Sequence, residues 1–267
     1  MNISNLGRLI GAGLLALGLH AFAPSASAQT FASGLPADWT CFGNCDTSVA
    51  DGVVGLAPGG GTQVGYVSTD FGFIGASPFA LGEESTGSRL TSAVFAASAG
   101  DQLALQFNYV STDGDEFADY AWARLVEAGS GATAAMLFSA TTQPAGLLVP
   151  SASLPTVGAT LTPATASIVD NSTLWSPLGD DAGSCWGAGC GSSGWVQSAF
   201  TFAGNGNYRL EFGVVNWSDS AYQSGLAFDG AFIAAGNNNV TAPVPEPQTW
   251  ALMIAGLAAL WFVRRRA

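Results

Sequence analysis

The chain has 267 residues, of which 48% are hydrophobic and only 10% are charged, and its seven basic residues are all arginine. That length suits one large β domain or two ordinary domains, with ample material for a hydrophobic core. The one histidine, His20, lies in an apolar N-terminal stretch. Without that stretch the chain has neither His nor Lys, which excludes a Ser-His-Asp triad, a Schiff-base lysine and an imidazole metal site.

The central part of the chain is strongly acidic. Between Gln29 and Pro243, three arginines stand against 18 acidic residues, so this part carries a net charge of −15. Binding to nucleic acid needs a cationic patch that displaces counterions from phosphates, and no such patch exists in this stretch. Nucleic acid is therefore excluded as a partner.

Residues 1–28 have the pattern of a secretory signal peptide. Arg8 supplies the positive charge, Leu9–Ala23 the apolar run, and Ala26-Ser27-Ala28 the small-residue cleavage site before Gln29. Glycines interrupt the apolar run, which disfavours the alternative of a transmembrane anchor. We expect signal peptidase to remove this segment and the remainder to be exported to an oxidising compartment.

Residues 29–235 form the predicted ectodomain, in which apolar side chains recur with a period of two. In Asp101–Val110, for example, Leu103, Leu105, Phe107 and Tyr109 fall on one face. Alternation of this kind is typical of antiparallel strands, and eight to ten strands predict an all-β, jelly-roll-like β-sandwich. The further predicted strands are Asp119–Glu127, Thr133–Ser139, Trp195–Phe202, Asn207–Trp217 and Leu226–Ile233.

Residues 140–181 interrupt this pattern. They are rich in Pro, Ser, Thr and Ala and alternate poorly. We interpret them as a long excursion over the surface of the sandwich that contributes one or two edge strands.

Four cysteines occur as two close pairs, Cys41 with Cys45 and Cys185 with Cys190. In an exported chain an even number of cysteines favours disulfides, and the glycine between the members of each pair permits the tight turn that local pairing requires. We therefore predict the local disulfides Cys41–Cys45 and Cys185–Cys190. Pairing across the two groups remains open, as does a zinc site made of four thiolates.

The densest acidic cluster follows directly after a predicted strand. Alternating carboxylates around a glycine suit calcium, which takes six to eight oxygen ligands in flexible geometry. The alternative is a solvated acidic turn with no metal, and no other cofactor is indicated. The candidate calcium ligands are Asp113, Asp115, Glu116 and Asp119, joined by Asp219 and Asp229 from later strands.

Six tryptophans lie in the ectodomain, and exposed aromatic faces stack on sugar rings. Trp175 and Trp186 belong to the irregular middle of the chain and are the best candidates for exposure to a ligand. The alternative is that both indoles pack in the core or beneath loops.

The C-terminal end has three parts. Residues 236–248 form a polar, proline-stiffened linker, and residues 249–263 are apolar and uncharged. A helix of that length reaches about 22 Å, which spans a slightly thinned bilayer and predicts a transmembrane helix. The arginine-rich residues 264–267 would then lie on the cytoplasmic side.

The order of these parts resembles a known sorting signal. Val244-Pro245-Glu246-Pro247, followed by a short apolar helix and a final arginine run, resembles the PEP-CTERM signal of Gram-negative bacteria. The resemblance implies processing by an exosortase, a membrane transpeptidase-like cysteine protease, with Pro245, Glu246 and Pro247 as the sorting motif. Phe117–Leu125 and Ser224–Gly230 also look like stretches of uncharacterised PEP-CTERM ectodomains.

Together these features predict a non-enzymatic protein of the cell surface or extracellular matrix, sorted by its C-terminal end. The main alternative is a carbohydrate-binding module that holds exopolysaccharide, with calcium as a cofactor. A glycan hydrolase that uses two carboxylates is a third hypothesis, since its mechanism needs neither His nor Lys.

Overall fold

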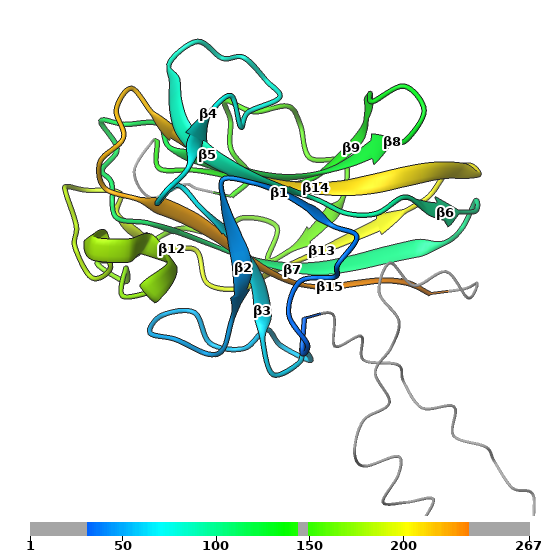
Figure 1. The fold of residues 1–267 in the computed structure, drawn as a ribbon, viewed down its shortest axis with the longest axis horizontal. Helices are drawn as coiled ribbons and strands as arrows, with labels where there is room; N and C mark the ends of the chain where they lie inside the picture. Colours follow the sequence, from blue (N-terminus) through cyan, green and yellow to red (C-terminus); the bar gives the residue numbers. More distant parts are fainter. Residues whose placement is uncertain (1–30, 144–148, 235–267) are drawn as a thin grey trace, which may run out of the picture.

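The computed structural model describes residues 31–143 and 149–234, which fold into two antiparallel β-sheets packed face to face (Figure 1). The first sheet has the order β1-β5-β14-β8-β9, with β4 paired to β5 and β6 paired to β14. Its strands are β1 (Thr40–Phe42), β4 (Phe73–Ile74), β5 (Glu84–Thr91), β6 (Phe95–Ala97), β8 (Tyr120–Glu127), β9 (Thr133–Thr141) and β14 (Gly206–Trp217).

The second sheet has the order β10-β13-β7-β15-β3-β2, and β12 joins β11 to β7. Its strands are β2 (Asn44–Ser48), β3 (Val64–Ser68), β7 (Gln102–Ser111), β10 (Thr160–Thr162), β11 (Val169–Asp170), β12 (Gly191–Ser192), β13 (Val196–Thr201) and β15 (Ser224–Ala234). The prediction of an all-β sandwich with antiparallel pairing is confirmed.

All six predicted strands are present as β7, β8, β9, β13, β14 and β15, with ends that differ by a few residues at most. The excursion is also confirmed, because β10 pairs with the outer edge of β13 and is followed by the short strand β11. The 3₁₀ helix η1 (Ser176–Asp181) closes this part of the chain. The strands before residue 98 were not predicted individually, and the number of strands in the described residues exceeds ten.

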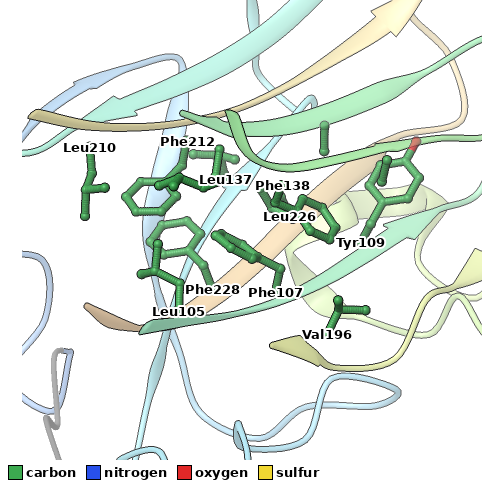
Figure 2. Close-up of a cluster of buried hydrophobic side chains, with 14 of the residues drawn as sticks. Leu105, Phe107, Tyr109, Leu137, Phe138, Val196, Leu210, Phe212, Leu226 and Phe228 are labelled. Carbon is green, nitrogen blue, oxygen red and sulfur yellow. The ribbon is translucent and has the colours of Figure 1, made fainter. Parts of the chain in front are cut away.

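The main core lies between the two sheets and is rich in aromatic rings. Figure 2 shows Phe212 of β14 pointing from the first sheet toward Phe228 and Phe107 of the second. The Phe212 and Phe228 rings stack with their centroids 4.1 Å apart and their planes 4° from parallel. The four residues that alternation placed on one face of β7 all belong to this core, so the predicted face of that strand is correct.

The outer faces of both sheets are also partly buried. Trp175 and Leu178 cover the outer face of the second sheet, and Trp122 belongs to a cluster on the outer face of the first. Trp122 lies against Gly213 of the neighbouring strand, where a Cβ atom would come within 2.1 Å of the indole. Glycine at 213 thus makes room for a fully buried tryptophan.

Several predicted segments fall outside the described residues. These are the signal peptide at 1–28, the linker with its PEP motif, the helix at 249–263 and the arginine-rich end at 264–267. Within residues 31–143 and 149–234, no helix is long and apolar enough to cross a membrane.

Candidate functional site

Strand ends from both sheets bring polar side chains together at one end of the sandwich. Ser111 ends β7 and faces Ser224, which begins β15, while Asp119 directly precedes β8. These side chains point between the sheets, since they continue the inward-facing rows of their strands. We call this region the acidic end and define it by Asp113, Asp119, Asp181 and Asp219. The charge of Asp219 raises the pKa of both Asp113 and Asp119, and that of Asp181 raises the pKa of Asp113.

Asp119 is fully buried and is held from two sides. Its Oδ1 accepts a hydrogen bond from the Trp217 N–H at 2.8 Å, and its Oδ2 accepts one from the Ser224 hydroxyl at 2.7 Å. The Ser224 hydroxyl also lies 2.8 Å from that of Ser111. Burial, reinforced by the charge of Asp113, raises the pKa of Asp119 well above its usual value, which favours the neutral acid. Asp119 therefore joins β8, β14 and β15.

Asp113 is buried with one oxygen left without a partner. Its Oδ1 accepts a hydrogen bond from the Gly114 N–H at 2.8 Å, whereas Oδ2 makes no hydrogen bond within the described residues. Burial, with the charges of Asp219 and Asp181 added, raises the pKa of Asp113 to about 7. The described residues form two ion pairs, and in both of them the acid is Glu211, paired with Arg124 and with Arg89. No arginine among these residues therefore pairs with an aspartate of the acidic end.

The structure brings together only some of the candidate calcium ligands. Three of them, Asp113, Asp119 and Asp219, lie at the acidic end. Asp181 also lies there but was not among the predicted ligands, although it follows another acidic residue, Asp180. Asp115 lies half-buried in the adjoining loop, and Glu116 is exposed. Nowhere in the described parts of the chain are three His, Cys, Asp or Glu side chains arranged to hold a metal. Calcium binding stays a prediction.

Asp229 does not belong to this group. Its Oδ2 accepts a hydrogen bond from the Gly61 N–H at 3.2 Å and its Oδ1 one from the Gly230 N–H at 2.7 Å. At about 3.3 Å per residue, Asp229 lies roughly 17 Å along β15 from Ser224. The expectation that it joins the acidic cluster is wrong: it fixes the loop around Gly61 to the sheet instead.

The two candidate tryptophans have opposite environments. Trp186 is 53% exposed and lies beside Tyr222, with the ring centroids 5.0 Å apart. Trp175 is fully buried, which corrects the expectation that it is free to stack on a ligand. Trp175 is buried because Gly225 of β15 has no side chain, so the Trp175 ring lies directly on that strand.

Both predicted local disulfides are present, Cys41–Cys45 and Cys185–Cys190. The first closes the turn at which the chain passes from β1 in one sheet to β2 in the other. The second closes the loop that carries Trp186, whose backbone N–H donates to the Thr112 carbonyl at 2.9 Å. This loop is thereby fixed beside the acidic end, and the alternatives of cross-pairing and a thiolate zinc site are excluded.

Comparison with known proteins identifies no relative by sequence: no family model and no curated protein matches the chain. Two solved structures that match are the K1 and K3 cleaved adhesin domains of Lys-gingipain from Porphyromonas gingivalis W83. They are 12% and 14% identical, with TM-scores of 0.37 and 0.36, and the matches cover 79% and 78% of this chain and 98% of each domain.

A third match is the enzymatically active domain of tailspike protein 4 from bacteriophage CBA120, which is 13% identical with a TM-score of 0.29. That match covers 72% of this chain and 18% of the tailspike chain. Similarities this low establish neither a shared activity nor shared site residues for this chain.

Proposed function

We propose that this chain is an exported protein of the cell surface or extracellular matrix whose sandwich works by binding and not by catalysis. The observation that carries the proposal is the pair of short-range disulfides, Cys41–Cys45 and Cys185–Cys190. Structural disulfides are typical of oxidising compartments outside the cytoplasm. They agree with export directed by residues 1–28.

Burial of Asp113 and Asp119 supports a role without catalysis. A two-carboxylate hydrolase needs a pair of acids about 5–9.5 Å apart that flank the bond to be cleaved. Asp113 and Asp119 have strongly raised pKa values but are only 1% and 0% exposed. A polymer cannot reach them, so these carboxyls act on the fold and not on a substrate.

We further propose that the PEP motif directs sorting of the exported chain. Two prolines restrict the backbone around Glu246, which lowers the entropy lost when the segment docks in a protease. The exosortase would read this carboxylate, and the apolar residues 249–263 would hold the chain in the membrane until it is processed.

Replacing Glu246 tests this proposal in the native host. Glu246→Ala should accumulate as a longer, membrane-retained form, because the only charge in the motif is lost. Cell fractionation with immunoblotting measures the form and its compartment, and Gln248→Ala serves as a control just outside the motif. Normal processing of Glu246→Ala would contradict the sorting role. Full-length protein that is soluble in the cytoplasm with residues 1–28 attached would contradict export.

A second candidate function is retention of polysaccharide, and the Trp186–Tyr222 pair favours it. Two aromatic rings at the surface offer an apolar face to a sugar ring, while the Cys185–Cys190 disulfide restricts the loop that presents them. Aromatic side chains supply such contact area with little loss of conformational entropy. We define Trp186 and Tyr222 as the aromatic pair.

Affinity gel electrophoresis of the purified full-length protein tests the aromatic pair. We expect a soluble neutral polysaccharide to slow the migration of the wild type, and Trp186→Ala to weaken that affinity about tenfold, or roughly 1.4 kcal/mol. Trp217→Ala, a half-buried tryptophan outside the pair, is the matched control. Equal retardation of wild type and Trp186→Ala would reject the aromatic pair as the binding surface.

A further inference from the structure

An open groove of about 700 Å³ lies on the outer face of the second sheet. None of the residues that line it belongs to the aromatic pair or to the acidic end. Strands β2 and β3, adjacent at the edge of that sheet in Figure 1, provide its base. Residues 49–51 and the start of η1 provide its walls.

The base of the groove combines an aromatic ring with polar groups. Tyr66 of β3 faces Asp46 of β2 in register, so both side chains lie on the same outer face. Tyr66 is half-buried, and its ring meets that of Trp175 edge to face at 5.9 Å. Gln63 also lines the groove. The ring is thus held by the buried tryptophan beneath it.

Backbone hydrogen bonds to carboxylates order both the walls and the base of the groove. Asp51 Oδ2 accepts a hydrogen bond from the Ser176 N–H at 2.8 Å, which ties the loop at 49–51 to η1. Asp46 Oδ1 accepts one from the Thr47 N–H at 2.8 Å. The groove is therefore organised before any ligand arrives, and ordering it costs little on binding.

Several hydrogen-bonding groups in the groove are left without protein partners. Within the described residues, neither the Tyr66 hydroxyl nor the Gln63 amide makes a hydrogen bond, and Asp46 Oδ2 accepts none. A carboxylate and an amide together accept and donate hydrogen bonds, as the neighbouring hydroxyls of a sugar require. The aromatic ring adds apolar contact area.

Shape and charge decide between ligand classes. Small-molecule sites bury most of their ligand, whereas this groove is open, which suits a segment of a longer chain. Two carboxylates and no basic residue line it, and the stretch from Gln29 to Pro243 carries a charge of −15. An acidic polymer would be repelled.

We propose that this groove binds a neutral polysaccharide chain, with Tyr66 as its apolar contact and Asp46 and Gln63 as its hydrogen-bonding groups. The site deepens the second candidate function and rests on it. It uses none of the residues of the aromatic pair, so the two surfaces can be tested one without the other.

The test measures the groove in a background that lacks the aromatic pair. Full-length Trp186→Ala protein is run in affinity gels that contain laminarin, dextran or hydroxyethyl cellulose as neutral polymers, and alginate as the acidic polymer. We expect at least one neutral polymer, and not alginate, to slow this protein. Adding Tyr66→Ala should weaken the remaining affinity about tenfold, and Asp46→Asn or Gln63→Ala should weaken it severalfold.

Control variants separate loss of binding from loss of fold. Asp38→Asn removes an exposed carboxylate outside the groove and should leave retention unchanged. Asp46→Asn and Gln63→Ala preserve the packing of Tyr66 on Trp175, so they test the groove even where Tyr66→Ala lowers the melting temperature.

The outcomes show whether the groove alone fails or whether the proposed polysaccharide function fails with it. Complete loss of retention in Trp186→Ala alone would overturn the groove and support the aromatic pair. Retention that survives Asp46→Asn and Gln63→Ala unchanged would also overturn it, as would retention by alginate alone. Absence of retention of the wild type by every polymer would overturn the groove and the polysaccharide function together, while the proposals on export and sorting would still be judged by fractionation.

Discussion

Raising the pH from about 4 to about 8 should lower the unfolding free energy of the sandwich by roughly 4 kcal/mol through Asp113. Burial raises its pKa from 3.8 to about 7. The folded state therefore holds a proton that the unfolded state has already released over this range. Stability from this group is fully present below about pH 4 and is lost as the pH rises to about 7. Urea unfolding at a series of pH values measures the loss.

Asp113→Asn isolates this effect from the other titrating groups. At about pH 8 the variant should be more stable than the wild type by up to roughly 4 kcal/mol, because it buries no charge. Near pH 4 the two should be similar. The pKa of Asp119 is also raised by burial, and its contribution to the pH dependence of stability is present in both proteins. Asp38→Asn, which removes one exposed carboxylate, controls for the change in net charge. Equal stability of Asp113→Asn and wild type at pH 8 would contradict the prediction.

Truncating Phe212 to alanine should cost about 3–5 kcal/mol of unfolding free energy, the usual range for a buried phenylalanine. Its ring lies between the sheets, 4.1 Å from Phe228 and 6.2 Å from Phe107, and also stacks on Trp39 at 5.9 Å. The side chain is fully buried. Its loss therefore leaves a cavity lined by three aromatic rings, which cannot collapse without moving one sheet against the other.

The matched control is Phe71→Ala, which truncates a phenylalanine that is 83% exposed and should change stability by no more than about 0.5 kcal/mol. Phe212→Leu keeps most of the buried volume and should cost less than the alanine variant. Urea midpoints with an unchanged m-value report these differences as stability. A loss for Phe212→Ala as small as that for Phe71→Ala would show that this ring does not join the sheets.

Strands were predictable from sequence where alternation continued for several residues. In β7 and β14, the apolar side chains that enter the core stand at every second position, and that pattern is local. Strands β1, β2 and β4 are only two to five residues long and have no fully buried position. Their pairing partners lie elsewhere in the chain, so the short segments carried no recognisable period.

The candidate site was predictable only in part, for a similar reason. Asp113 and Asp119 are near in sequence, and their proximity in the fold follows from the loop between β7 and β8. Asp181 arrives from η1, and Asp229 points to a different loop because of its place along β15. The groove at Tyr66 joins β2, β3 and η1, and no local pattern records such a meeting.

The amino-acid sequence alone determined the strand alternation and the acidic charge, and it favoured the two local disulfides, whose partners are separated by only four and five positions. Each of these depends on neighbours in the chain. Tertiary structure decided which tryptophan is exposed, which carboxylates share one end and where a groove forms. Burial depends on what packs against a side chain from distant parts of the chain. Trp175 is covered because Gly225 leaves room for it on β15, whereas Trp186 meets Tyr222 on one side and stays 53% exposed.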